Sequence, residues 1–219
     1  MVDFGEAIKR PFSDWKKLAI GAVMYMIPIV NIITQFFGMG YVLTCGATAI
    51  KKQKKLPEWK DWGGLFIKGL LAAIIGIIYL IPAIIIGVIA VGATVLTGFT
   101  AEAMPAMLGS LGAGMVVTLL VGLLTVYIVP VAILMYASEG KFGSAFRLGD
   151  VFKKAFTGKY FAAWILAVVS SVVLHVVGLL ISAPLAITIV LPLVISGFVS
   201  IIVGIISMTL IGEALGEIK

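Results

Sequence analysis

The chain has 219 residues, of which 62% are hydrophobic and 12% charged, and its mean hydropathy is +1.21. A water-soluble fold of this size cannot bury so large an apolar fraction, so the composition excludes an ordinary soluble domain. The formal net charge is +6. Because the basic residues flank apolar segments, where lipid headgroups and membrane topology explain them, we expect no nucleic-acid partner.

Two long stretches of the sequence are almost free of charge. Between Lys68 and Glu139 the only charged residue is Glu102, and between Lys159 and Glu213 there is none. Each stretch exceeds the roughly 20 residues needed to cross a bilayer once. They are apolar on every side and lack the alternation of a membrane barrel, so they predict helices. We therefore expect an all-α, polytopic transmembrane protein that forms a single integral membrane domain over residues 1–219.

Basic residues fall in three clusters along the chain, and each cluster adjoins an apolar tract. The positive-inside rule places all three clusters in the cytoplasm, so an even number of crossings must separate them. This pattern predicts three helical hairpins with both termini cytoplasmic. The cytoplasmic interfacial segments are expected at residues 1–17, 51–63 and 138–159, and the transmembrane hairpins at residues 18–50, 64–137 and 160–213.

Six crossings result, with turns expected near residues 28–31, 98–105 and 182–184. The first tract is the shortest, because two helices of about 17 to 20 residues only just span a core about 30 Å thick. A single long, bent helix in this tract gives a five-crossing alternative. That alternative leaves the N-terminal Lys and Arg residues outside, against the charge rule.

Aromatic residues precede each hairpin. Two of these segments repeat large apolar residues at helical spacing among cations, which is typical of amphipathic helices in the headgroup plane. The repeated residues are Phe4, Ile8, Phe12 and Trp15, then Phe142, Phe146, Phe152 and Phe156. Solvated loops that carry aromatics are the alternative. The candidate lipid-headgroup contacts are Lys9, Arg10, Trp59, Trp62, Arg147, Lys153 and Lys154.

A short pattern occurs twice. FGEAIKRPF at residues 4–12 resembles FGSAFRLGDVF at residues 142–152, and both share Phe-Gly-x-Ala, an apolar residue and a basic one. Each copy precedes a predicted hairpin. The pattern indicates duplication of a hairpin unit, with chance similarity in an apolar chain as its competitor.

The candidate intramembrane polar site consists of His175, Asn31 and Gln35. An ionisable residue near the middle of a membrane helix is a functional hypothesis by default, for instance a proton relay or a substrate contact. The competing interpretation is a neutral imidazole that hydrogen-bonds a carbonyl or a Ser, and we favour it because no second ionisable group lies at that depth. Asn31 can equally stabilise the chain reversal.

The sequence offers little for catalysis. It has one His and one Cys, and it lacks a phosphate-binding Gly-rich loop and metal-ligand spacing, so we expect no enzyme, cofactor or metal. Cys45 is interpreted as a small packed side chain. Prolines at 28, 82, 130 and 192 are expected to bend helices, either along a transport pathway or simply to shape packing. Two small-residue stripes favour close helix contacts within the chain or between copies: Ser196, Ser200 and Gly204, then Gly109, Gly112 and Gly114.

Several phrases together resemble a known family. LPEWKDWGGLFIKGL followed by IGIIYLIP, the Gly40-Tyr41 pair and the FG-x-AF-basic segment after Tyr136 to Gly140 are similar to the archaeal and bacterial membrane family called domain of unknown function 4013. The resemblance covers nearly the whole chain, and residues 56–62 are its most specific part. It implies a prokaryotic inner membrane. The family's name records no function, so no catalytic residue is carried over.

We therefore expect a non-enzymatic membrane protein whose partners are membrane lipids, and which self-associates through its small-residue faces as a homo-oligomer. The alternative is a small transporter or channel for a weakly polar or lipid-like solute, using His175, Asn31, Gln35 and the proline kinks. A transporter needs a cavity that reaches these residues, whereas a structural protein buries them against neighbours.

Overall fold

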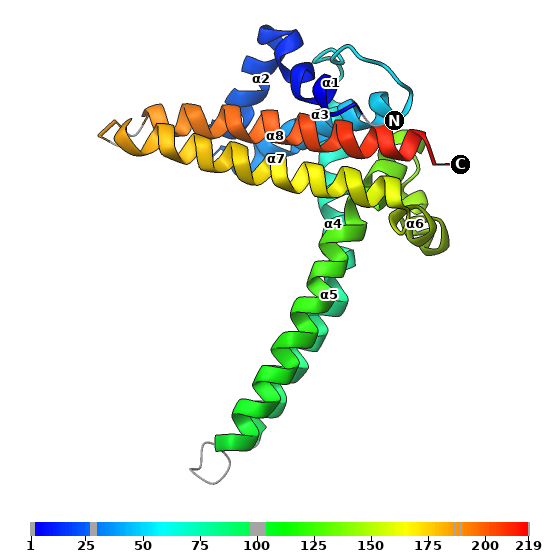
Figure 1. Ribbon diagram of the computed structural model, residues 1–219, viewed down its shortest axis with the longest axis vertical. Helices are drawn as coiled ribbons and strands as arrows, with labels where there is room; N and C mark the ends of the chain where they lie inside the picture. Colours follow the sequence, from blue (N-terminus) through cyan, green and yellow to red (C-terminus); the bar gives the residue numbers. More distant parts are fainter. Residues whose placement is uncertain (1–2, 27–29, 97–103, 186, 189, 219) are drawn as a thin grey trace. The chain divides into compact units, whose positions relative to one another are not determined.

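The structure is a computed structural model that describes residues 3–26, 30–96, 104–185, 187–188 and 190–218, and all regular elements in these ranges are helical. Figure 1 shows these helices coloured along the chain. The all-α prediction is therefore confirmed for this part of the chain. The helices are α1 (Phe4–Lys9), η1 (Arg10–Ser13), α2 (Trp15–Met26), α3 (Asn31–Ile50), α4 (Trp62–Leu96), α5 (Met104–Glu139), η2 (Phe142–Phe146), α6 (Leu148–Ala155), α7 (Gly158–Ser182), η3 (Ala183–Leu185) and α8 (Val190–Gly216).

Five of the described helices, α3, α4, α5, α7 and α8, are long and apolar enough to cross a membrane. These helices identify a multi-pass membrane protein, as predicted. Helix α2 has 12 residues, so it rises only about 18 Å and falls short of a 30 Å core. The predicted count of six crossings in three hairpins is therefore not confirmed.

The first apolar tract is divided into two helices. Val30 lies in a turn just before α3, and the Thr34 hydroxyl donates to the carbonyl of Met24 at 2.7 Å. The ring of Tyr25 packs where a side chain at Gly38 would stand. Helices α2 and α3 therefore lie antiparallel, and the single bent helix of the five-crossing alternative is not seen. Pro28, where the turn was expected, lies outside the described residues.

The chain divides into two compact units, residues 1–73 with 130–219 and residues 74–129. Within the first unit, α8 packs against α2, α3 and α7, and α7 and α8 lie side by side (Figure 1). The α3 and α8 backbones approach closely because glycines face each other there. Gly46 and Gly212 meet at one level, and Gly204 faces Val42 at another. Their order along both helices shows that α3 and α8 run parallel.

The core of this unit is apolar and closely packed. Leu18, Tyr41, Ile201 and Ile205 are fully buried within it. Cys45 is also fully buried, which confirms its interpretation as a small packed side chain. The core therefore fixes one end of α2 and α3 against the middle of α8.

The second unit consists of parts of α4 and α5. The Thr125 hydroxyl donates to the carbonyls of Val121 at 2.8 Å and Tyr79 at 3.4 Å. Pro82 follows Tyr79 within α4 and removes one backbone donor from this turn of the helix. Thr125 thus supplies a polar contact beside the proline. Long apolar side chains cover most of this unit's surface, as a membrane-spanning pair requires.

The expected proline bends differ in position. Pro82 and Pro130 lie inside α4 and α5. Pro192 is the third residue of α8, where its missing N–H would have no helical partner in any case, so the predicted interior bend there is wrong.

Candidate functional site: a polar end and two hollows

Polar contacts join the first two basic clusters at one end of the first unit. Lys54 Nζ lies 2.5 Å from Glu6 Oε1, and Arg10 Nη2 donates to the carbonyl of Lys55 at 3.3 Å. The N-terminal cations therefore lie beside the loop of residues 51–61. This placement agrees with the charge rule, which puts both clusters on one side, and disagrees with the five-crossing alternative.

The third basic cluster reaches the same end through the last turns of α8. Lys159 Nζ lies 3.0 Å from Glu217 Oε2, and the Asp3 backbone N–H donates to Glu213 Oε2 at 3.0 Å. We call this region the polar end: α1, η1, the loop of residues 51–61, the start of α7 and the last turns of α8. It gathers cations that are far apart in the sequence.

Arg10 lies inside the polar end, with only 6% of its surface exposed. Its Nη1 donates to the Cys45 carbonyl at 3.0 Å and to Thr209 Oγ1 at 2.9 Å, and its Nη2 donates to Thr48 Oγ1 at 2.7 Å. Its Nε is buried without an acceptor among the described residues. The guanidinium thus contacts α3, α8 and the loop of residues 51–61. The sequence instead predicted that Arg10 contacts lipid headgroups.

Burial lowers the pKa of Arg10 from its ordinary value. The ordinary pKa of a guanidinium is so high that Arg10 nevertheless stays charged at neutral pH. The charge lies near the C-terminal end of α3, where exposed carbonyls favour a cation. Arg10 therefore fixes the N-terminal segment to α3, α8 and the loop of residues 51–61, and we call this set of contacts the Arg10 pin.

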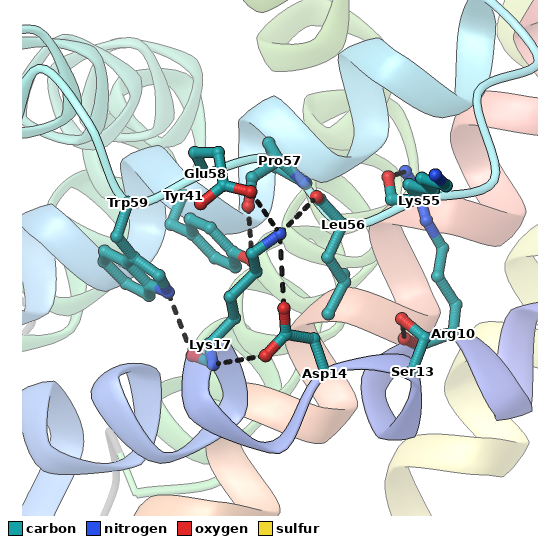
Figure 2. Close-up of polar contacts among 10 residues, drawn as sticks. All are labelled: Arg10, Ser13, Asp14, Lys17, Tyr41, Lys55, Leu56, Pro57, Glu58 and Trp59. Carbon is teal, nitrogen blue, oxygen red and sulfur yellow. Dashed lines mark hydrogen bonds and ion pairs between the residues drawn. The ribbon is translucent and has the colours of Figure 1, made fainter.

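Lys17 forms a second link between the N-terminal segment and the loop (Figure 2). Its Nζ lies 2.7 Å from Glu58 Oε1 and 3.3 Å from Asp14 Oδ2, and it donates to the Leu56 carbonyl at 3.1 Å. The hydrogen bond with Glu58 raises the pKa of Lys17. The backbone N–H of Lys17 donates to Asp14 Oδ1 and lowers the pKa of Asp14, which caps α2.

Aromatic rings hold the middle of the same loop. Trp59 stacks on Tyr41 with ring centroids 3.9 Å apart, and its indole N–H donates to the Lys17 carbonyl at 2.9 Å (Figure 2). The Tyr41 hydroxyl donates to the Pro57 carbonyl at 3.1 Å. Trp59 is 9% exposed. The structure therefore places this ring within the protein, whereas the sequence predicted it at the headgroups.

The loop ends in a helix cap. Asp61 Oδ1 accepts the Gly64 backbone N–H at 3.0 Å at the start of α4, and Asp61 has a φ of 54°, a region that Asp tolerates better than most residues. Trp62 stacks on Trp59 and contacts Phe37. Nearly every residue of the phrase at 56–62, the most specific part of the family resemblance, thus has a structural partner.

An exposed apolar ridge lies along the N-terminal segment. Phe4, Ile8, Phe12 and Trp15 are 38%, 37%, 42% and 64% exposed, and Ala7 is fully buried. Short helices α1 and η1 therefore present large apolar side chains outward. This is the arrangement expected of an interfacial segment, in which apolar side chains enter the lipid and the other face packs on the protein.

The second interfacial segment repeats this arrangement. Phe142 is 37% exposed and Ala145 is fully buried, matching Phe4 and Ala7 in the repeated Phe-Gly-x-Ala pattern. Further along, Val151 of α6 is buried, while Phe156, directly after α6, is 65% exposed. The two copies of the pattern therefore share both sequence and burial.

The remaining predicted headgroup contacts lie at the surface. Lys9 and Lys153 are exposed and Lys154 is half-buried. Trp62 is 43% exposed. Arg147 contacts Glu139 and lies 3.5 Å from Asp150. Contact of these side chains with lipid stays a prediction.

A hollow of about 420 Å³ opens in the polar end. Its walls come from α1, η1, the loop after α3 and the last turns of α8. Ionic residues of both signs line it, together with Ser13, Ala49 and Gln53. The ionic residues are Asp3, Glu6, Lys9, Arg10, Lys52, Lys54, Glu213 and Glu217.

His175 borders a second hollow, of about 370 Å³, between α7 and α8. Its Nδ1 lies 2.8 Å from the Ser171 carbonyl. Because a carbonyl only accepts, Nδ1 carries the proton in this contact. The imidazole thus hydrogen-bonds a carbonyl of its own helix, as the non-functional interpretation of His175 predicted. The side chain is exposed, however, and is not buried against a neighbouring helix.

Asn31 and Gln35 are not among the residues that line the His175 hollow. Gln35 Nε2 donates to the Ile32 carbonyl at 3.3 Å, and Asn31 Oδ1 is buried without a donor among the described residues. The structure therefore does not bring the three predicted polar residues into one site.

The two small-residue stripes differ. Gly204 of the first stripe faces Val42 within the chain, and Gly114 of the second faces Ala90. Among the described residues, no atom lies within 4 Å of the place where a Cβ of Gly109 or Gly112 would stand. The first stripe therefore serves packing within the chain, whereas part of the second stays uncovered.

No group of three or more His, Cys, Asp or Glu side chains suited to a metal ion occurs in the described ranges. The comparison with curated proteins and the comparison with solved structures each gave no match. The family described as "Protein of unknown function (DUF4013)" matches residues 23–183. This match spans more than half of the chain and includes α3 to α7 and the loop held by Lys17, which confirms the resemblance drawn from that loop. The chain belongs to the DUF4013 family.

Proposed function

We propose that this chain is a non-enzymatic integral membrane protein whose polar end binds anionic lipid headgroups at the cytoplasmic face of a prokaryotic inner membrane. The observation that carries the proposal is the meeting of three basic clusters at one end of the first unit, beside two exposed apolar segments. Exposed rings there can enter the lipid while the cations meet phosphates.

The number of unpaired cations supports this function. Ion pairs occupy Lys17, Lys54, Arg147 and Lys159. In the part of the chain that the structure describes, several further lysines of the three basic clusters have no ion pair: Lys9, Lys16, Lys51, Lys52, Lys60, Lys141, Lys153 and Lys154. Each Lys near an anionic surface contributes about 1 kcal/mol of attraction.

The test compares two lipids in the full chain. The protein is reconstituted with phosphatidylglycerol or phosphatidylcholine carrying brominated acyl chains, and quenching of Trp fluorescence reports their relative affinity. We expect a several-fold preference for phosphatidylglycerol that falls as salt screens the charges. A double substitution by Gln of Lys51 and Lys60, which lie in the loop of the polar end, should weaken the preference, and the matched substitution by Arg should keep it. Equal quenching by both lipids would contradict the proposal.

The uncovered glycines support self-association as part of the same proposal. Gly109 and Gly112 leave α5 with a smooth face in the second unit, where the helix of another copy could approach closely. Gly112→Leu should lower the yield of a crosslinked dimer in proteoliposomes, while Gly114→Ala, which faces Ala90 within the chain, serves as the comparison. If the unsubstituted chain gives only monomer after crosslinking, association is refuted.

Transport is the second candidate, supported by the hollow beside His175. Because Nδ1 contacts the Ser171 carbonyl, the other ring nitrogen, Nε2, is left for a solute, and Ser182 and Ser196 line the same hollow. A fluorescent phosphatidylglycerol serves as the lipid-like probe, and dithionite bleaching reports its movement across vesicles. Movement that requires the chain and is lost in His175→Leu would favour transport, whereas vesicles with and without protein that bleach alike would oppose it.

A further inference from the structure

The hollow in the polar end has walls of opposite charge. Asp3, Glu213 and Glu217 come from the N-terminus of α1 and the end of α8, whereas Lys52 and Lys54 come from the loop after α3. The lining contains four acidic and four basic residues, so the hollow suits neither a simple anion nor a simple cation. A ligand that carries both charges would match it.

Some charges in this hollow are already satisfied. Arg10 donates to neutral oxygens inside the protein, and Lys54 pairs with Glu6. Glu217 pairs with Lys159 outside the hollow. These groups shape the walls but have less capacity left for a ligand.

Besides Arg10, four lining charges have no ion pair among the described residues: Asp3, Lys9, Lys52 and Glu213. Glu213 accepts only a backbone N–H, from Asp3. Lys52 follows α3 with a φ of 58°, a conformation that Gly or Asn adopts with less strain at a helix end. Lys52 lines the hollow from this position, at the end of α3, and its side chain is exposed.

The neighbouring surface indicates where such a ligand comes from. Asp3, Glu6 and Lys9 follow one another at three-residue spacing on α1 and line the hollow, while Phe4 and Ile8 of the same helix are exposed. A lipid whose headgroup enters the hollow could therefore run its acyl chains past Phe4 and Ile8. A water-soluble ligand would make no use of these side chains.

We propose that this hollow binds a zwitterion with a primary ammonium and a phosphate, such as the headgroup of phosphatidylethanolamine. The ammonium donates to Glu213 and Asp3, and the phosphate accepts from Lys52 and Lys9. Because the site requires both charges, it goes beyond the attraction of the basic clusters for anionic lipid and does not depend on it.

Native mass spectrometry of the full chain in detergent provides the test, with phosphatidylethanolamine, phosphatidylcholine and phosphatidylglycerol offered in equal amounts. We expect phosphatidylethanolamine to be retained best. Phosphatidylcholine carries a trimethylammonium that has no N–H to donate, and phosphatidylglycerol has no cation for Glu213. Adding soluble phosphoethanolamine distinguishes the sources: competition at millimolar levels identifies the headgroup chemistry alone, and no competition identifies the intact lipid.

Variants on both walls complete the test. Lys52→Gln and Glu213→Gln should each reduce phosphatidylethanolamine retention about tenfold or more, since each removes a charge-assisted contact. Lys16→Gln is the control, because Lys16 is exposed and does not line the hollow. A thermal melt of each variant reports folding, and Lys52→Arg, which keeps the charge, should retain the lipid if folding is intact.

Two outcomes would overturn the proposal. Retention of all three lipids alike, unchanged in Lys52→Gln and Glu213→Gln, would show that the hollow takes no headgroup. Preference for phosphatidylglycerol that depends on Lys52 but not on Glu213 would show an anion site instead. Both outcomes differ from the result expected if the basic clusters do not bind anionic lipid. In that case the preference for phosphatidylglycerol in vesicles would be absent, while the hollow would still select a lipid with an amine.

Discussion

The two Phe-Gly-x-Ala segments differ most in what their arginines do. Arg10 is buried and donates to α3, α8 and the loop of residues 51–61, whereas Arg147 is half-exposed and pairs with nearby carboxylates. Both segments bury their Ala and expose their first Phe. In the repeated pattern Arg147 corresponds to Lys9, which is also exposed, whereas Arg10 is the next residue and corresponds to Leu148. The shared pattern therefore sets how each segment lies on the protein, and the additional arginine of the first segment makes the buried contacts.

The largest effect should come from exchanging the two arginines for leucine. Arg10→Leu leaves Thr48, Thr209 and the Lys55 carbonyl without their donor, so we expect about 3 kcal/mol less stability. Arg147→Leu removes exposed ion pairs and should cost less than about 1 kcal/mol. Thermal unfolding in detergent micelles measures both. Equal losses would show that Arg10 is not the pin we describe.

Replacing an aromatic residue in each region sharpens the same comparison. Trp59→Leu loses the stack on Tyr41 and the hydrogen bond to Lys17, so we expect a loss of about 2 kcal/mol. Phe156→Leu, at a ring 65% exposed in the second segment, should change stability by about 0.5 kcal/mol or less. Proteolysis within residues 3–17 should speed up in Trp59→Leu only. Unchanged proteolysis would contradict the link between ring and segment.

Enlarging the shared alanines tests what the segments have in common. Ala7 and Ala145 are both fully buried, so leucine at either position overfills a packed site and should cost about 1.5 kcal/mol. Ala→Gly at the same positions controls for the backbone, and chemical unfolding provides the measurement. A loss at only one position would break the structural equivalence of the two copies.

The smallest effects should appear in the pH dependence of the N-terminal link. Asp14 has a lowered pKa in the folded chain, so its stabilisation is present above its ordinary value of 3.8 and is lost as the pH falls below it. Lys17 has a raised pKa, so its stabilisation is present below 10.5 and is lost as the pH rises through its folded pKa. Melting temperatures should decline at both extremes, less steeply at low pH in Asp14→Asn and at high pH in Lys17→Gln. If the melting temperatures of both variants depend on pH as those of the unsubstituted chain do, Asp14 and Lys17 are not the source of the pH dependence.

The long apolar helices could be predicted from the sequence because composition and length determine them almost alone. The interfacial segments could also be predicted, since Phe4, Ile8 and Phe12 recur at helical spacing. A turn near residues 28–31 was predicted as well, but two membrane-spanning helices were expected around it. The length of α2 was not predicted: it has only 12 residues, and Lys16 and Lys17 lie inside it rather than before it.

The polar end was only partly predictable. Basic clusters indicated that it exists, but the partners of Arg10, namely Cys45, Thr48 and Thr209, lie up to 199 positions away and carry no charge. Lys17, Tyr41 and Glu58 were missed as a linked group because they lie on three separate segments of the sequence. The Gly40-Tyr41 pair and the phrase at residues 56–62 were the available signals, since both belong to the family resemblance and the structure brings them together.

The most direct test of this account asks on which side of the membrane the three basic clusters lie. Cys45→Ala removes the only native thiol, after which single cysteines replace Lys16, Lys51 or Lys141. A membrane-impermeant maleimide is then applied to whole cells and to inverted vesicles. We predict that all three positions react only in inverted vesicles, which places the clusters and the Arg10 pin together on the cytoplasmic side. Reaction of position 16 from the side opposite to positions 51 and 141 would contradict the account and restore five crossings.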